Sequence, residues 1–596
     1  MRDQDPEATP DKKLTDWQLF RRIAPWVREE RRWFWAVLIL TPLGVLSQVV
    51  QPLLLQIGID DYIAARDMPG LTRIAALFAV AVVGAWLSAS FGYFALQRIS
   101  LRGLARLRAS IFAHIAAQGS SFFDKRHAGS LLTRTINDVD AIYESLARGA
   151  IQLLTNALLI VGMLVAMLWM SPELTLTAFI FSPVIWLVVR FFRTRLRPIS
   201  LVIRETLSRL NGYFAERIFG MTVVQVSGAQ EISQTTFDDM SRDYMQAYHK
   251  SNWLDAGLYA VMDGMSSLAT AAIVFYAAMS FTGADAGQAI TVGVLVAFID
   301  YLGRIFVPIR EFSGQIATLQ RSFAALEKIF ELLDTDERIK ELPPGEQGTP
   351  EQVRGAISFA GVGFSYRQAG PQILYDIDLA IKPGEVVALV GATGSGKSTL
   401  GKLLLRMYDG YTGRIEIDGV GIKQWGLAAL RDAVTVVHQD GWLLEATLAD
   451  NVRLGDSQID DADIAAAGRL AQADAFVDRL PEGWHTVCRE RGSNISAGER
   501  QLIAITRAFA RPAPIVILDE ATASIDAMTE KRLDVALANL FKTRTVIVIA
   551  HRLQTIQTAD RIVVLDKGRI VESGSHAELM ALGGRYRTLV ETGFAL

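Results

Sequence analysis

A glycine-rich loop with a lysine near its end is the stretch of this chain whose residue types point most directly to chemistry. Gly391 to Thr399 read GATGSGKST and match the phosphate-binding pattern G-x-x-x-x-G-K-[ST]. Glycines let the backbone curl so that successive N–H groups face phosphate oxygens, and the start of the next helix adds further free N–H groups. In this pattern Lys397 reaches the β- and γ-phosphates, and Ser398 offers its hydroxyl to Mg²⁺. The loop therefore predicts ATP and Mg²⁺ as cofactors.

The residues on both sides of the loop support a nucleotide site. Residues 387–390 read as a buried strand, and residues 400–407 read as a helix with one apolar face. A glycine-serine turn that matches the pattern by chance is the alternative. This strand and helix disfavour it, because they are the context that the pattern requires. The predicted ATP contacts within the loop are Gly391, Thr393, Gly394, Ser395, Gly396, Lys397, Ser398 and Thr399.

A second group of chemical residues follows an apolar strand further along the chain. Residues 515–518 read IVIL and are followed by Asp519 and Glu520. Asp519 is placed to hold Mg²⁺ through water, opposite Ser398. Glu520 can orient and polarise the attacking water that phosphoryl transfer requires. A strand that ends in Asp-Glu is weak evidence alone, but it is strong evidence downstream of a phosphate loop.

Composition separates this chain from an ordinary soluble ATPase. Of its 596 residues 51% are hydrophobic, and the mean hydropathy is +0.25. The formal net charge of -3 gives no basic surface that would favour nucleic acid as a partner. The single cysteine, Cys488, allows no internal disulfide and fits a protein whose water-exposed mass is cytosolic.

Six long apolar segments predict a multi-pass integral membrane protein. A bacterial inner or cell membrane is its expected location. Each is near or above the ~20 residues that cross the hydrocarbon of a bilayer. Arginines are frequent at 98–148 and 190–209, whereas the short turns between other segments are poor in Lys and Arg. By the positive-inside rule, both termini and the two long connections are expected in the cytosol. The predicted spans are 33–57, 71–96, 150–170, 174–192, 256–281 and 288–309.

The two long cytosolic connections, 97–149 and 193–255, keep helical periodicity. Turn signals interrupt them near 122–129 and 219–222. Each connection is therefore expected to be a helix that leaves the membrane, a short transverse segment and a returning helix. At about 1.5 Å per residue, such a hairpin would extend roughly 35–40 Å. Two independent soluble inserts are the alternative, but neither connection carries a core of its own.

The remaining regions complete the expected fold class, a six-span α-helical membrane domain with helical extensions followed by an α/β P-loop ATPase domain. Residues 14–27 predict an amphipathic helix at the cytosolic membrane face, with an ordinary soluble helix as the alternative. Further strands are expected at 434–437 and 546–550. The expected parts are a disordered N-terminus at 1–13, the membrane domain at 14–333, a linker at 334–355 and the ATPase domain at 356–596.

Together these features resemble a half-transporter of the ATP-binding-cassette (ABC) exporter family, in which six membrane helices are followed by one ATPase cassette. The resemblance covers the chain from about Leu14 onward and depends on an ordered set of motifs. A lone histidine after an apolar strand is usually structural, but the ordered set is specific. Beyond the loop and the Asp-Glu pair, the motifs are FSY at 364–366, VHQD at 437–440, ERG at 490–492, ISAGE at 495–499, SID at 524–526 and His551.

The resemblance implies a role for each motif. Tyr366 would stack on adenine, and His551 would contact the γ-phosphate. Gln439 would sense Mg²⁺ and water and contact the membrane domain. Ser496 lies in the signature segment, usually LSGGQ, which binds the ATP held by a second cassette. The implied catalytic residues are Glu520, His551 and Gln439, the Mg²⁺ ligands are Ser398, Gln439 and Asp519, partly through water, and the further ATP contacts are Tyr366, Ser496, Gly498 and Asp526.

The signature segment departs from the family pattern. In the family two cassettes close head to tail, and each ATP lies between one phosphate loop and the other chain's signature. Here Ala497 stands in place of a glycine and Glu499 in place of glutamine. The extra Cβ hinders close backbone approach, and the carboxylate brings like charge toward a polyanion. This predicts the catalytic half of a heterodimer whose partner has an intact signature. A homodimer that tolerates the variant is the alternative.

The sequence leaves the transported substrate open among amphiphilic drugs, lipids and peptides. Asp263 and Asp300 lie within or near apolar segments, where carboxylates are costly and often functional. They could select cationic amphiphiles, or they could form a hydrogen bond between helices. An ATP-gated channel or regulatory membrane protein is the alternative class, which Glu520 disfavours because it serves turnover. An importer is less favoured, since importers usually separate membrane and ATPase subunits.

Overall fold

The computed structural model describes residues 15–143, 149, 151–282, 290–350, 352–367, 370–438, 441–519, 526–550 and 552–592. The chain divides into two compact units, and each is described by itself. We call Met1–Ile115 with Gly129–Thr335 the helical unit, and Ala116–Ala128 with Asp336–Leu596 the α/β unit. The short segment 116–128 therefore belongs to the α/β unit, although residues of the helical unit flank it on both sides in sequence.

The helical unit consists of long apolar helices. In the described part of the chain, 6 of its helical stretches are long and apolar enough to cross a membrane, which confirms the predicted spans. The main helices are α1 (Asp16–Val27), α2 (Arg31–Ile57), α3 (Met68–Ala116), α7 (Ile151–Met170), α8 (Pro172–Phe179), α9 (Ser182–Phe219), α11 (Gln230–Thr282) and α12 (Val292–Asp334). Shorter helices are α5 (Ala128–Thr133), α6 (Val139–Ile142) and α10 (Met221–Val226).

A cluster of buried apolar residues lies where α2, α7, α11 and α12 meet. Met163, Phe298 and Tyr301 are fully or almost fully buried there. The hydroxyl of Tyr301 donates to the backbone carbonyl of Val49 at 2.5 Å, so this buried polar group is satisfied. Outward-facing side chains such as Trp169, which is 80% exposed, remain apolar. Such a surface suits the hydrocarbon of a bilayer, because exposed apolar groups need no compensation there.

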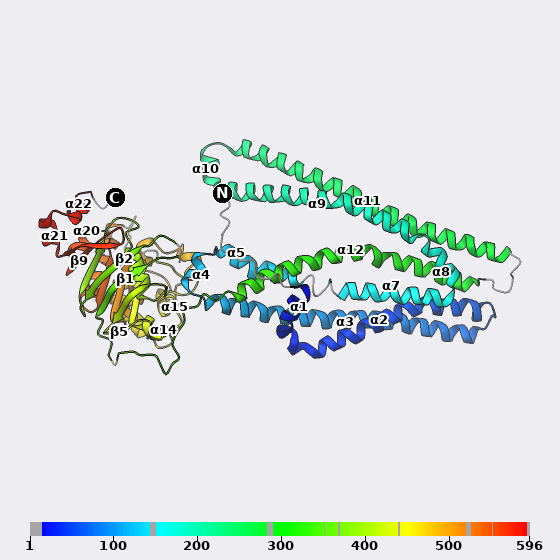
Figure 1. Cartoon of the computed structure of the whole chain (residues 1–596), viewed down its shortest axis with the longest axis horizontal. Coiled ribbons are helices and arrows are strands. Elements are labelled where there is room, and N and C mark those ends of the chain that lie inside the picture. Colours follow the sequence, from blue (N-terminus) through cyan, green and yellow to red (C-terminus); the bar gives the residue numbers. More distant parts are fainter. Residues whose placement is uncertain are drawn as a thin grey trace. The chain divides into compact units, whose positions relative to one another are not determined.

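The second long connection is a helical hairpin, as predicted. Helices α9 and α11 run side by side (Figure 1). The short helix α10 joins them between Gly220 and Gly228. Gly228 has a φ of +62°, a conformation that glycine adopts without steric cost. The chain therefore reverses direction within a few residues, and the transverse segment is short.

The α/β unit contains two sheets. A 4-stranded antiparallel sheet has the order β2-β1-β4-β5, and a 6-stranded sheet has the order β10-β9-β3-β8-β7-β6. Strands β9, β3, β8, β7 and β6 run parallel, and β10 pairs antiparallel at the edge. The strands are β1 (Ile357–Phe364), β2 (Leu374–Ile381), β3 (Val386–Val390), β4 (Thr412–Ile417), β5 (Val420–Gly421), β6 (Val434–Val437), β7 (Ile515–Asp519), β8 (Thr545–Ile549), β9 (Arg561–Asp566) and β10 (Arg569–Gly574).

The helices of this unit connect and cover the strands. Apolar residues of the parallel strands are buried on both faces, which accounts for their continuous runs of Val, Ile and Leu. The predicted strands are thus confirmed to within one residue at each end. The helices are α4 (Ser120–Asp124), α13 (Lys397–Leu404), α14 (Leu427–Ala433), α15 (Leu448–Arg453), α16 (Asp461–Leu470), α17 (Asp474–Val477), α18 (Ala497–Ala510), α19 (Ala527–Phe541), α20 (Leu553–Gln557), α21 (His576–Leu582) and α22 (Arg585–Glu591).

Candidate functional site

The phosphate loop lies between the end of β3 and the start of α13, as the pattern requires. Its backbone needs glycine, because Gly391, Gly394 and Gly396 have φ values of +151°, +81° and +102°. A Cβ on Gly391 would lie 2.1 Å from the carbonyl oxygen of Leu565, and a Cβ on Gly396 would lie 2.6 Å from the Cδ2 atom of Leu374. Residues of β9 and β2 therefore pack closely against the loop, and they leave no room for side chains at Gly391 and Gly396.

Lys397 and Ser395 supply polar groups inside this curl. The Nζ atom of Lys397 donates to the carbonyl oxygens of Gly391 at 2.8 Å and Ala392 at 3.0 Å, and so spans the loop. Burial lowers the pKa of Lys397, while the negative charge of Asp519 opposes this shift. The Oγ atom of Ser395 is buried without a hydrogen-bond partner among the described residues. A buried ammonium and an unsatisfied hydroxyl fit a ligand that is rich in phosphate oxygens.

Two of the three predicted magnesium ligands, Ser398 and Asp519, lie on the same edge of the sheet. Ser398 is exposed in the first turn of α13. Asp519 ends β7 and pairs in register with Ile549 of β8, which also pairs with Leu389 of β3. Asp519 therefore lies level with the end of β3, near the start of the loop. One hydroxyl and one carboxylate fit Mg²⁺, which usually keeps several waters and is held by phosphates besides one or two carboxylates.

Tyr366 lies just beyond β1 and beside the phosphate loop. Its hydroxyl lies 3.0 Å from the Oγ1 atom of Thr399, and its ring contacts Phe364 and Tyr408 edge to face at centroid distances of 5.0 and 5.2 Å. The side chain is held between these groups yet remains 39% exposed. A fixed aromatic ring with an open face is what stacking on a planar base needs. The Nζ atom of Lys402 lies 5.9 Å from the ring centroid and adds positive charge nearby.

Hydrogen bonds and ion pairs hold the short helix α4 against the rest of the α/β unit, next to the aromatic residues around Tyr366. The hydroxyl of Tyr408 donates to the carboxylate of Asp124, and Phe122 is completely buried. Lys125 and Arg126 form ion pairs with Glu337 at 2.9 and 3.2 Å. Burial alone would raise the pKa of Glu337, but these partners lower it overall. Tyr408 thus contacts both the helix α4 and the ring of Tyr366.

The signature segment, Ile495 to Glu499, forms the N-terminus of α18. Ser496 is the N-cap, and its hydroxyl donates to Glu499 Oε2 at 2.8 Å. The backbone N–H of Ser496 donates to the same oxygen at 3.0 Å, and the N–H of Glu499 donates back to Ser496 Oγ at 3.3 Å. This is a capping box, in which donors at the helix start are satisfied within the turn. Ala497 is exposed beside it, and Gly498 is buried.

The other predicted site residues differ in what the structure says of them. Asp526 is the N-cap of α19 and accepts hydrogen bonds from the N–H groups of Met528 and Thr529 at 3.1 and 3.0 Å. The bonds from Thr529 contribute most to the lowering of its pKa. Gln439, Glu520 and His551 lie outside the described residues. Their roles therefore stay predictions, although the strands β6, β7 and β8 that precede them are in place.

Two groups of contacts in the α/β unit could not be predicted from the sequence. Arg507 of α18 donates to the carbonyl oxygens of Asn451 at 2.6 Å and Trp442 at 3.0 Å, and so ties the signature helix to the segment that follows the predicted Gln439 loop. Tyr408 reaches Asp124 across 284 positions of the chain. Neither contact has a local pattern, since each joins residues far apart in sequence.

The membrane carboxylates singled out from the sequence also have a structural context. Asp300 accepts from Arg304 one turn along α12 at 3.0 Å, and Arg304 donates to Gln51 of α2 at 3.0 Å. Asp300 is therefore part of a polar link between two helices. Asp263 is an exposed residue of α11 whose backbone carbonyl accepts from Ser267.

Comparisons with known proteins agree with this architecture. Residues 34–309 match the ABC transporter transmembrane region, and residues 374–523 match the ABC transporter family. An uncharacterized ABC transporter ATP-binding protein of Bacillus subtilis, YknV, is 34% identical over 98% of this chain and 96% of its own length. An ATP-dependent lipid A-core flippase of Thiobacillus denitrificans is 35% identical over 96% of this chain and 98% of its own.

Two further similarities bear on the cargo and the fold. A fatty acid ABC transporter ATP-binding/permease protein of Mycobacterium bovis is 36% identical over 89% of this chain and 81% of its own. The solved structure of a bacterial Atm1-family ABC exporter with ATP bound superimposes with a TM-score of 0.75 and 25% identity. It covers 95% of this chain and 99% of that structure.

Proposed function

Because the chain belongs to the family of ABC transporters, as an ATP-hydrolysing half-transporter of the exporter type with six membrane helices, we propose that it exports an amphiphilic substrate as one half of a heterodimer. Relatives described as a lipid A-core flippase and a fatty acid transporter support an amphiphilic cargo, whether lipid, drug or peptide. The cytosolic placement of both termini rests on the arginine-rich connections.

In this proposal the phosphate loop and its neighbours hold ATP. Lys397 exchanges its backbone carbonyl partners for phosphate oxygens, and Tyr366 stacks on adenine. Ser398 and Asp519 hold Mg²⁺, which neutralises phosphate charge when bound. Glu520 polarises the attacking water and His551 contacts the γ-phosphate, while Gln439 senses the metal and contacts the membrane domain. No covalent intermediate is needed, only positioning and charge stabilisation.

Transport would follow from the closure of two cassettes over two ATP molecules. Each site would combine one chain's phosphate loop with the Ser and Gly of the other chain's signature, here Ser496 and Gly498, and Asp526 would line the interface. ATP binds the closed pair more tightly than the open pair, so it shifts the population toward closure. The helix α4, fastened to the α/β unit through Tyr408 and Glu337, would pass this movement to the membrane helices.

One observation carries the heterodimer: the hydroxyl and the N–H of Ser496 are both bonded to the carboxylate of Glu499. A γ-phosphate on the partner would need these same donors, and it would meet a negative charge in their place. The site completed by this signature is therefore expected to bind ATP and to hydrolyse it poorly. The ATP on this chain's own loop would instead be hydrolysed against the partner's intact signature.

The decisive experiment is the ATPase activity of this chain reconstituted alone, compared with its complex with a half-transporter of intact signature. The chain alone is expected to show little or no activity, because no intact signature completes the site of Glu520. Robust, cooperative activity of the chain alone, abolished by Ser496→Ala, would falsify the heterodimer and leave a homodimeric exporter. ATP-driven accumulation of a fluorescent amphiphile in inside-out vesicles separates an exporter from an ATP-gated channel, since a channel only dissipates gradients.

A further inference from the structure

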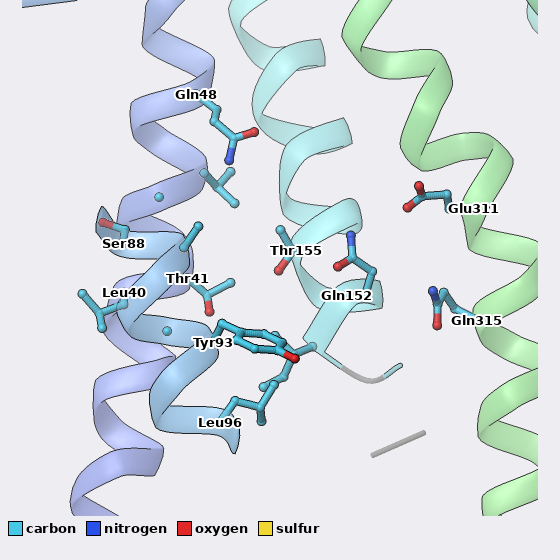
Figure 2. Close-up of a pocket in the computed structure, with 15 residues that line it drawn as sticks. Leu40, Thr41, Gln48, Ser88, Tyr93, Leu96, Gln152, Thr155, Glu311 and Gln315 are labelled. Carbon is cyan, nitrogen blue, oxygen red and sulfur yellow. The ribbon is translucent and has the colours of Figure 1, made fainter. Parts of the chain in front are cut away.

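The helical unit contains a cavity of about 620 Å³ between α2, α3, α7 and α12. Apolar side chains such as Leu40, Val45 and Leu96 line one part of it. Figure 2 shows Glu311 and Gln315 of α12 on the opposite side, with Gln152 and Thr155 of α7 between the two walls. An apolar wall that faces a few placed polar groups is typical of a ligand site, and the volume suits a drug-sized or single-chain lipid molecule.

Glu311 carries the charge of this cavity. Of the 15 residues that line it, Glu311 is the one with a charged side chain. The side-chain amide of Asn156 donates to Glu311 Oε2 at 3.4 Å. Asn156 is only 2% exposed. Gln152 in turn donates to Asn156 Oδ1 at 3.0 Å. This relay of amides orients the carboxylate, but amides do not neutralise its charge.

Other carboxylates near the spans are compensated differently. Asp300 pairs with Arg304 at 3.0 Å, and Asp60 accepts from Thr291 at 2.5 Å and from the N–H of Gly293 at 2.8 Å. Among the side chains that the structure describes, which do not include that of Arg310, no Lys, Arg or His forms an ion pair with Glu311. Glu311 therefore keeps a negative charge that a cationic ligand could compensate.

The position of Glu311 fits capture from the cytosolic leaflet. The apolar window of α12 runs from Val292 to Ile309, and Glu311 follows it directly. At about 1.5 Å per residue, Glu311 lies roughly 30 Å along α12 from Val292, where the hydrocarbon ends. A cationic head could meet Glu311 at this depth while the apolar part of the same molecule lies against α2 and α3, where Figure 2 shows Leu40 and Leu96 nearer the cytosolic ends of these helices than Glu311.

We propose that this cavity binds amphiphiles that carry a positively charged ammonium or other onium group, with Glu311 as the counter-charge. The proposal rests on the proposed export function and names its substrate class. Leu40, Val45 and Leu96 cover the apolar part of the ligand, and the face of Tyr93, which lies in the cavity in Figure 2, adds attraction for the cation. Anionic amphiphiles of the same size are disfavoured, because Glu311 would repel them without a compensating donor of positive charge.

The test uses two probes of matched size and opposite charge, tetraphenylphosphonium and tetraphenylborate. Their equilibrium binding is measured to the full chain in nanodiscs of neutral phosphatidylcholine without ATP, so that neither lipid charge nor ATPase activity enters. The unsubstituted chain is expected to prefer the phosphonium. Glu311→Gln keeps the shape of the side chain and should weaken phosphonium binding about tenfold, as expected for loss of one partly screened charge pair.

The control is Glu331→Gln, the same substitution at an exposed residue of the same helix outside the cavity. It should leave the binding of both probes unchanged. If Glu311→Gln does not fold, Gln315→Glu provides a second test, since a second carboxylate in the cavity should strengthen phosphonium binding. Equal effects of Glu311→Gln and Glu331→Gln, or a preference of the unsubstituted chain for tetraphenylborate, would overturn the assignment.

The result is separable from the export function. Because binding is measured without ATP, a chain that discriminates between the probes but fails to transport with any partner would refute the proposed function and leave the cation site standing. A chain that transports amphiphiles but binds both probes equally would refute the cation site and leave the proposed export function standing.

Discussion

The phosphate loop and the signature segment are built from the same parts, a turn that leads into the N-terminus of a helix, yet they hold their donors differently. In the loop, Lys397 bonds to neutral backbone carbonyls, and Ser395 Oγ is buried without a partner among the described residues. In the signature, the hydroxyl and N–H of Ser496 both bond to the carboxylate of Glu499. In the phosphate loop a phosphate could accept from these donors in place of the carbonyl groups. In the signature the donors already bond to a carboxylate.

This difference has an energetic meaning. In both turns one partner of the hydrogen bond is charged, but the charge has opposite sign. Lys397 brings a positive charge that attracts phosphate, whereas the donors of Ser496 are bonded to the negative carboxylate of Glu499. In the proposed heterodimer the carboxylate of Glu499, which also pairs with Arg479 at 3.8 Å, would place negative charge near the triphosphate held by the partner. The two helix N-termini therefore differ in the donors that they offer to a phosphate, and at the signature the side chain of Glu499 makes the difference.

The largest expected effect separates the two turns directly. In the complex with a partner of intact signature, Lys397→Ala should reduce steady-state ATPase activity by on the order of 10²-fold or more, because the transferred phosphoryl group loses a preorganised cation. Ser496→Ala in the same complex should reduce it only about two- to threefold, since in the proposed heterodimer Ser496 would belong to the weak site. Equal, severe losses in both variants would mean that the two turns serve equivalent sites.

Much of this contrast could be predicted from the sequence, and the reason is locality. The strand, loop and helix around Lys397 follow one another directly, so composition and spacing were enough. The spacing Ser-x-x-Glu at 496–499 is itself the pattern of a capping box, so the bond between Ser496 and Glu499 had a sequence signal that the comparison with the family's glutamine did not use.

By contrast, no local sequence pattern predicted the cavity of the helical unit or the contacts that hold α4 in the α/β unit. Asp263 and Asp300 attracted attention because they interrupt apolar runs, whereas Glu311 lies just after such a run. Its importance depends on helices from four separate parts of the chain that meet around it. Tyr408 likewise reads as an ordinary aromatic residue until folding brings Asp124 beside it. Contacts between distant segments are set by tertiary packing, which local patterns do not describe.

A smaller effect tests how much Tyr366, beside the phosphate loop, contributes to ATP binding. Tyr366→Ala should weaken ATP binding by about 1–3 kcal/mol, the usual cost of losing an aromatic ring that stacks on a base. Tyr366→Trp should largely keep the affinity. Tyr366→Phe removes only the bond to Thr399 and should cost far less than Tyr366→Ala. The measurement is titration of ATP against inorganic triphosphate, which lacks the base. Parallel losses for both ligands would exclude base stacking.

The smallest expected effect concerns Glu499 and bears most directly on the comparison. Glu499→Gln keeps an oxygen that can accept from Ser496 but removes the charge, so the donors are held by a neutral group, as in the phosphate loop. ATP bound at the partner's loop should then be held roughly threefold more tightly, since the repulsion is gone and the hydrogen bonds are weaker. Labelled ATP retained by the complex measures this, in a Glu520→Gln background that stalls hydrolysis at the other site.

A matched control exists within the chain. Ser575 and Glu578 form the same kind of capping box at the start of α21, with the N–H of Ser575 donating to Glu578 at 2.8 Å. Glu578→Gln should lower stability by about the same amount as Glu499→Gln, a few tenths of a kcal/mol for a lost charge at a helix N-terminus. It should leave ATP retention unchanged. If both variants lower the melting temperature alike and neither changes retention, Glu499 is only a helix cap. If retention rises in Glu499→Gln alone, its charge is what keeps the signature from binding the partner's phosphate.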